Sequence, residues 1–255
     1  MKRALWWGWS VLVLLFLLAP VLVVIPLSFS TGSFLSFPLP GIGLRWYDAF
    51  FASDFWMLAL TNSALIGLAA TLGATVLGTA AAVGLWNARF PGQGVAMAVI
   101  VSPMVVPTII TGVALTFAFA PVGLANTHAG LIIAHIALAA PFVVVTVLAA
   151  LQQFDRTLMR AAAANGARPV AAFLRVMLPL ILPGVVAGAL FAFAISLDES
   201  VVVLFLAGPA QRTLPRQMFA GLKDSIELTI MAAATILVVV STLLMAATLL
   251  VRRRR

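Results

Sequence analysis

The stretch Ala129–Leu151, AGLIIAHIALAAPFVVVTVLAAL, contains no Asp, Glu, Lys or Arg. A helix needs about 20 mostly apolar residues to cross the hydrocarbon core of a bilayer. The apolar residues run continuously instead of alternating, which favours a helix over a strand of a membrane barrel. This stretch therefore predicts a transmembrane helix.

Five further stretches meet the same criterion, so we predict an all-α, polytopic membrane protein with six transmembrane helices in a single transmembrane domain, residues 1–255. The first stretch follows Met1-Lys2-Arg3 like a signal peptide, but it is too long for one, and we expect an uncleaved anchor. The five stretches are Leu5–Phe29, Met57–Leu85, Val95–Phe119, Ile181–Leu206 and Leu228–Val251.

The composition excludes a water-soluble enzyme. The chain has 255 residues, of which 64% are hydrophobic and 9% charged, and its mean hydropathy is +1.18. A soluble domain has about 45–50% apolar and about 25% charged residues. The chain has no cysteine, which excludes a disulfide framework, a thiol nucleophile and a thiolate metal site.

The positions of the basic residues predict the orientation. If the N-terminus is cytoplasmic, eleven of the 15 Lys and Arg residues fall on the cytoplasmic side. Basic residues concentrate in cytoplasmic loops, so we expect both termini in the cytoplasm. The net charge of +8 then reflects topology and contact with lipid headgroups, and we expect no nucleic-acid partner. The eleven are Lys2, Arg3, Arg89, Arg156, Arg160, Arg168, Arg175 and Arg252 to Arg255.

The cytoplasmic segment 152–180 has a helical pattern of its own. Asp155 suits a helix N-cap, and Asn165-Gly166 is a strong signal for a helix end. Pro169 suits the first turn of a second short helix. From the residues alone two interpretations are open: the hairpin docks a partner protein, or its amphipathic helices rest on lipid headgroups.

This segment resembles the cytoplasmic EAA loop of permease subunits of bacterial ABC importers. The family pattern is Glu-Ala-Ala, three residues, Gly, nine residues and Ile-x-Leu-Pro. The matching residues are Arg160, Ala161 and Ala162, then Gly166, then Val176, Leu178 and Pro179. The spacing is intact. Arg160 departs from the usual Glu, which bears on any ion pair that this position makes with the ATPase.

Other stretches resemble the polyamine branch of these permeases, which transports putrescine and spermidine. The resemblance implies a type I importer permease in the bacterial cytoplasmic membrane. Its partners would be two cytoplasmic ATPases, a second and different permease, and a periplasmic or lipid-anchored solute-binding protein. The stretches are Leu44–Tyr47, Asn62-Ser63, Pro103–Pro107, Ser196–Ser200, Phe205–Pro209 and Arg212–Pro215.

The chain itself is not expected to be an enzyme or to hold a cofactor. It lacks the phosphate loop G-x-x-x-x-G-K-[ST], so ATP and magnesium are expected on the partner ATPase. His128 and His135 lie seven residues apart, but without a cysteine or a nearby carboxylate we expect no metal site.

Asp198 and Glu199 are the acids embedded within a predicted span. Intramembrane carboxylates tend to face a cavity, so the pair is a candidate lining for a cation pathway. The alternative is that the pair marks the outer interface, with Arg212 or Arg216 as partners.

Three other functions are alternatives to a polyamine permease. A permease of the same class for a phosphonate, iron or sulfate is the nearest alternative. A secondary transporter would show repeated halves with broken helices, and the sequence shows no internal repeat. An intramembrane enzyme would need paired catalytic groups, and no such arrangement is present in the sequence.

Overall fold

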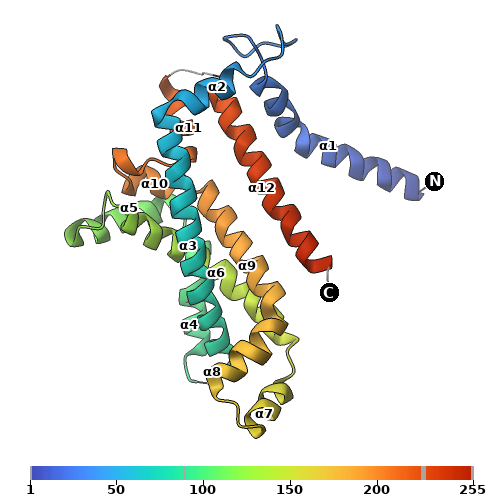
Figure 1. Cartoon of the computed structure of the whole chain (residues 1–255), viewed down its shortest axis with the longest axis vertical. Coiled ribbons are helices and arrows are strands. Elements are labelled where there is room, and N and C mark those ends of the chain that lie inside the picture. Colours follow the sequence, from blue (N-terminus) through green and yellow to red (C-terminus); the bar gives the residue numbers. More distant parts are fainter. Residues whose placement is uncertain (1, 89, 225–227, 254–255) are drawn as a thin grey trace.

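A computed structural model of the chain describes residues 2–88, 90–224 and 228–253, and this part of the chain is helical (Figure 1). Among the described residues the one extended pairing is an isolated bridge between Ser30 and Ile42. The all-α prediction is therefore confirmed.

Three long helices form the centre of the molecule: α3 (Asp54–Asn87), α6 (His128–Gln152) and α9 (Leu178–Asp198). Their contact faces are mostly apolar, and Ala74, Val143 and Ile181 are fully buried in one cluster. Glycines allow the close approach. A Cβ atom built on Gly78 would lie 2.7 Å from Cβ of Val143, and one on Gly188 would lie 2.5 Å from Oγ1 of Thr146. Small residues at helix crossings are typical of membrane bundles.

Four unbroken helices are long and apolar enough to span a membrane, so the structure supports four or five spans among the described residues and does not reach the predicted six. They are Trp6–Ser28, Asp54–Asn87, His128–Gln152 and Pro169–Asp198. Two of the predicted spans, Val95–Phe119 and Ile181–Leu206, are interrupted.

The predicted span Val95–Phe119 is a bent pair. Helix α4 (Gln93–Val101) passes through a 3₁₀ turn (Ser102–Met104), and α5 (Thr108–Phe119) follows after a bend of 103°. Pro107 is the N-cap residue of α5. Proline has no N–H and its ring clashes with a preceding turn, so it suits the start of a new helix better than the continuation of an old one. In Figure 1, α5 lies across the bundle and not along it.

The predicted span Ile181–Leu206 is also interrupted. Helix α9 ends at Asp198, Glu199 is extended with φ −72° and ψ 108°, and α10 (Val201–Leu206) starts in a new direction (Figure 1). Helix α10 buries one apolar face against α5 and α6. That cluster contains Val202, Val203 and Leu206 from α10, Leu131 and Leu138 from α6, and Leu115 and Phe119 from α5.

The start of α3 is covered by α2 (Arg45–Ala52), α11 (Leu214–Asp224) and α12 (Thr229–Arg253). Phe50, Trp56 and Leu214 are buried where these helices meet. Helix α12 corresponds to the predicted span Leu228–Val251, and its stretch Thr229–Leu243 is apolar. Arg254 and Arg255, which belong to the predicted cytoplasmic tail, lie outside the described residues.

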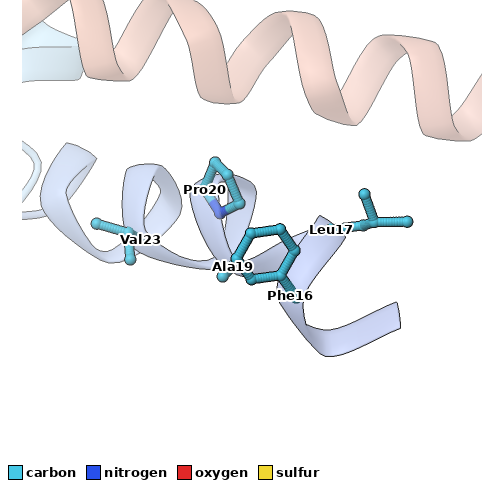
Figure 2. Close-up of a pocket in the computed structure, with 5 residues that line it drawn as sticks. All are labelled: Phe16, Leu17, Ala19, Pro20 and Val23. Atoms are coloured by element: carbon cyan, nitrogen blue, oxygen red, sulfur yellow. The ribbon is translucent and has the colours of Figure 1, made fainter. Parts of the chain in front are cut away.

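Helix α1 (Lys2–Ser28) stands beside α12 and away from the central bundle (Figure 1). Its membrane-length stretch is exposed, with Phe16 76% and Leu17 64% accessible. A shallow pocket of about 450 Å³ lies on this helix. Figure 2 shows the residues that line it, which are Phe16, Leu17, Ala19, Pro20 and Val23. Such an apolar surface suits lipid acyl chains.

Candidate functional site

The hairpin in segment 152–180 begins with a capped helix, as predicted. Helix α7 (Arg156–Ala164) follows Asp155, whose Oδ1 accepts a hydrogen bond of 2.8 Å from the backbone N–H of Thr157. The hydrogen bonds from Thr157 hold the pKa of the Asp155 carboxyl below its usual value, and Arg160 adds a smaller effect in the same direction. A carboxylate at a helix N-terminus is also favoured by the helix dipole.

The turn after α7 is the glycine turn that the sequence predicts. Gly166 has φ +78°, in the left-handed region. The N–H of Ala167 donates to the carbonyl of Ala162 at 3.0 Å, and the N–H of Gly166 donates to that of Ala163 at 2.9 Å. This pair of bonds is a Schellman motif. A Cβ atom on Gly166 would meet nothing within 4 Å, so the backbone angle, and not a lack of space, favours glycine here.

The second helix of the hairpin is not a separate short helix, which corrects the prediction. Helix α8 (Pro169–Ala172) runs through a π-helical turn (Phe173–Met177) directly into α9, giving 30 continuous helical residues. Pro179 cannot donate to the carbonyl of Arg175, four residues before it. A wider turn is a common way to accommodate such a lost bond inside a helix. The hairpin is therefore continuous with the membrane helix that ends at Asp198.

The motif residues divide between the tip of the hairpin and the helix that leaves it. Arg160, Ala161 and Gly166 are exposed and Ala162 is half-buried at the tip, at the end of the molecule opposite α2 (Figure 1). In the following helix Val176 and Leu178 are half-buried and Pro179 is exposed. The structure thus presents the first part of the motif on an open surface.

Sequence reasoning missed the contact that holds α7 against the bundle. Nη2 of Arg156 donates to the backbone carbonyl of Trp86, and its guanidinium carbon lies 4.1 Å from the centre of the Trp86 ring. The ring of Phe154 meets that of Trp86 edge-on at 5.6 Å. The sequence identifies Arg156 only as one of the basic residues that predict orientation, because a partner 70 residues away leaves no local signal.

Asp198 and Glu199 lie at the break between α9 and α10, and their roles differ. Asp198 is exposed. Glu199 is half-buried, and its Oε1 accepts a hydrogen bond of 2.8 Å from the N–H of Val202, so it caps α10. Arg212 donates to Oε1 of Gln217 at 2.9 Å, and Arg216 donates to the carbonyls of Ala207 and Gly208 at 2.8 and 3.0 Å. The two arginines are thus engaged with partners other than these acids.

Two polar residues of α3 hold the segment between α10 and α11. Nδ2 of Asn62 donates to the carbonyls of Ala210 and Arg212, each at 2.9 Å, and Oγ of Ser63 accepts from the N–H of Leu214 at 2.8 Å. The segment between α10 and α11 forms no long helix. These bonds supply partners for its backbone groups, because a buried backbone N–H or C=O needs a hydrogen-bond partner. In the sequence alone, Asn62-Ser63 is identified only through its resemblance to the polyamine permeases.

The two histidines have separate partners. Nε2 of His128 lies 2.9 Å from Oδ1 of Asn62, and Nδ1 of His135 lies 2.7 Å from Oγ of Ser196. Each histidine therefore joins α6 to a different neighbour, α3 in one case and α9 in the other.

A cavity of about 790 Å³ lies between α6, α7 and α9 on the side of the hairpin. Most of its lining is apolar, and its polar groups are Thr146, Gln153 and Asp155. The hairpin therefore lies beside an open groove between helices of the membrane bundle.

Comparisons with known proteins identify the family of this chain. Residues 74–255 match the family described as binding-protein-dependent transport system inner membrane component. The putrescine transport system permease protein PotI of Escherichia coli is 33% identical over 89% of this chain and 85% of its own length. The spermidine/putrescine transport system permease protein PotC of Haemophilus influenzae is 32% identical over 87% and 86%.

Solved transporters share the fold. A bacterial alginate ABC transporter in complex with its pentasaccharide-bound periplasmic protein aligns with a TM-score of 0.77, 17% identity and coverage of 99% of this chain and 94% of that chain. The methionine ABC transporter MetNI in an inward-facing conformation aligns with a TM-score of 0.61, 26% identity and coverage of 79% and 98%. The chain therefore belongs to the family of binding-protein-dependent transport system inner membrane components and is a multi-pass permease of the ABC importer class.

Proposed function

We propose that this chain is one permease subunit of an ATP-driven importer for polyamines such as putrescine and spermidine. The observation that carries the substrate class is the identity of 33% and 32% to permeases of putrescine and spermidine/putrescine systems, over 89% and 87% of this chain. The second permease is a different chain, a periplasmic or lipid-anchored binding protein delivers the solute, and the complex lies in the bacterial cytoplasmic membrane.

The hairpin around α7 is the docking site for the ATPase, which binds ATP and magnesium. Its support is the exposed tip with Arg160, Ala161 and Gly166, carried on a helix that runs on into the bundle. A rigid helix seated in a cleft of the ATPase transmits closure of that subunit to the membrane helices. Coupling of this kind needs no nucleotide site in the permease.

Substitution of Arg160 tests whether the hairpin and its ATPase carry complementary charges at this position. The family usually has Glu at this position, so the cognate ATPase of this chain is expected to place an acid opposite Arg160. Arg160→Glu then brings two like charges together and weakens co-purification of the ATPase. Arg168→Glu is the matched control, because Arg168 is also exposed and lies outside the motif. Equal effects of the two substitutions would argue against a specific pairing.

Asp198 is the side chain that we assign to the pathway. It is exposed at the end of α9, where the backbone is no longer helical. Non-helical backbone at membrane depth is tolerated where it is buried in protein or lines a water-filled cavity. A carboxylate there partly offsets the hydration that an ammonium group loses on passage, because opposite charges interact more strongly at low effective dielectric.

A second candidate solute is 2-aminoethylphosphonate. A putative permease for it, PhnU of Salmonella choleraesuis, is 29% identical over 81% of this chain and 80% of its own length. This solute shares a primary ammonium group with the polyamines but also carries an anionic phosphonate. An anion pathway presents Arg, Lys or helix N-termini to the solute, whereas the side chain exposed at the break is the carboxylate of Asp198.

Whole-cell uptake of labelled putrescine, spermidine and 2-aminoethylphosphonate tests the assignment, in a host without its own systems that expresses the complete importer. We expect polyamine uptake, a loss of uptake in Asp198→Asn, and unchanged solute affinity of the binding protein. Glu199→Gln is the matched control, because glutamine keeps an oxygen that accepts the bond from Val202. Uptake of the phosphonate without uptake of polyamines would contradict the polyamine assignment. The assignment as an ABC permease would still stand.

A further inference from the structure

Helix α3 has side-chain attachments near both of its ends, to the hairpin at one end and to the segment before α11 at the other. It runs without a break from Asp54 to Asn87, 34 residues. The attachment sites around Asn62 and Trp86 are 24 residues apart in one helix, about 36 Å at 1.5 Å per residue. A single element of this length reaches from the cytoplasmic hairpin to the segment before α11.

The inner attachment uses backbone groups that every helix leaves free. The last carbonyls of an α-helix have no partner within the helix. At the end of α3, the carbonyl of Leu85 accepts from Nε2 of Gln93 at 2.6 Å, and that of Trp86 accepts from Arg156. A cation at a helix C-terminus is also favoured by the dipole, and the guanidinium stacks on the Trp86 ring at 4.1 Å. Helix α7 is thus fixed to α3 at its first residue.

The outer attachment uses side chains of α3 to hold backbone groups elsewhere. Asn62 is 4% exposed and makes bonds of 2.9 Å to the carbonyls of Ala210 and Arg212 and to the ring of His128. Ser63 beside it holds the N–H of Leu214, the first residue of α11. A displacement of α3 is therefore expected to carry this outer segment with it, because three short hydrogen bonds, each at least partly buried, join the two.

We infer that α3 is the element that links the cytoplasmic hairpin mechanically to the outer segment 207–214, with Trp86, Arg156 and Asn62 as its positioning residues. This inference rests on the proposed function, in which the hairpin docks the ATPase. Motion of α7 that accompanies ATPase closure reaches the outer segment through α3 as one rigid body. In the other direction, a binding protein that contacts the outer segment acts on the ATPase through the same helix.

The quantity to measure is the stimulation of ATP hydrolysis by solute-loaded binding protein, as a ratio to the basal rate of the whole complex in lipid nanodiscs. Trp86→Leu removes the stacking face for Arg156, and Asn62→Ala removes the outer bonds. Each is expected to lower the stimulation about 2- to 30-fold, the range seen for residues that carry coupling, and to keep the basal rate. Trp86→Phe retains a ring and should retain more stimulation.

Trp9→Leu is the matched control, because Trp9 is 63% exposed on α1, outside the bundle. If both attachments act in one linkage, the double variant of Trp86 and Asn62 is no worse than the worse single variant. Independent, multiplying losses would overturn the inference, as would full stimulation in both single variants. An equal fall of basal and stimulated rates would indicate a merely structural role and also overturn it.

A second measurement does not depend on the solute. The chain has no cysteine, so labels can be placed at chosen positions. Spin-label distances from Leu72 on α3 to Ala163 on α7, and from Leu72 to Gln211, should stay the same between nucleotide-free and ATP-bound complexes. Distances that change with nucleotide would refute the rigid linkage. Absence of any ATPase stimulation in the wild type, with these distances constant, would instead count against the proposed function.

Discussion

His135 and Ser196 are joined by a hydrogen bond of 2.7 Å between Nδ1 and Oγ, and both side chains are buried, at 1% and 7% exposure. The bond joins α6 to α9 two residues before α9 ends at Asp198. Nε2 of the same ring has no partner among the described residues. The position at which the membrane helix stops is therefore fixed to the central bundle by a polar contact in an apolar layer.

Ser196→Ala should destabilise the permease by about 1 kcal/mol, because it leaves both nitrogens of a buried imidazole without a partner. Thermal unfolding of the purified protein in detergent measures the change. Ser102→Ala is the control, since Oγ of the exposed Ser102 bonds only to the carbonyl of Val99 in its own turn at 2.8 Å. Equal stability of Ser196→Ala and wild type would show that the contact contributes nothing.

Gly166→Val should abolish transport and weaken ATPase binding while the protein still inserts in the membrane. The left-handed conformation costs an L-residue about 1–2 kcal/mol, and more for a β-branched one. Gly166→Asn should keep most of the activity, because asparagine adopts this conformation with little penalty. Uptake and ATPase co-purification are the readouts. Similar behaviour of the Val and Asn variants would mean that the angle of +78° is not what matters.

The start of α7 should loosen in acid. The folded-state pKa of Asp155 is lowered by its hydrogen bonds to Thr157. Its stabilising effect is therefore fully present above the usual carboxyl pKa of 3.8 and disappears as the pH falls below that value towards the folded-state pKa. Hydrogen exchange of α7 amides at several pH values measures this. Asp155→Asn keeps a cap without the titration, so an unchanged acid response in that variant would assign the effect to another group.

Reporter fusions test the predicted orientation. Fusions within 162–168 and after Arg255 should report the cytoplasm, and fusions at Gly41 and Gly208 should report the outside. The distribution of Lys and Arg gives this expectation. A reporter that is active outside when placed in the hairpin would end the docking proposal, whatever the other fusions show.

Local signals could be interpreted from the sequence. Asp155 and Gly166 act on their own helix through groups two to five residues away, so residue type and spacing were enough to place the cap and the turn. The resemblance to the EAA loop includes Gly166. The family model matches residues 74–255, a range that contains this loop.

The helix breaks could not be predicted in the same way. Pro107 is the N-cap residue of α5 at the bend, yet Pro141 stays within the continuous helix α6. A proline alone thus does not fix where a span breaks. On both sides of Asp198-Glu199-Ser200 the sequence is apolar, over 187–195 and 201–206, which favours one continuous span, whereas α10 packs on α5 and α6. The contacts of Arg156 and Asn62 likewise depend on partners 70 and about 150 residues away.

The break at Glu199 has a consequence for biogenesis. During synthesis Ile181–Leu206 leaves the ribosome as one hydrophobic segment, long enough to enter the membrane in a single piece. Helix α10 packs against Leu115 and Phe119 of α5 and against Leu131 and Leu138 of α6. All four residues precede α10 in the chain. They are already made when α10 emerges, so the segment can divide into two helices as it arrives, without waiting for α12 or for the rest of the complex.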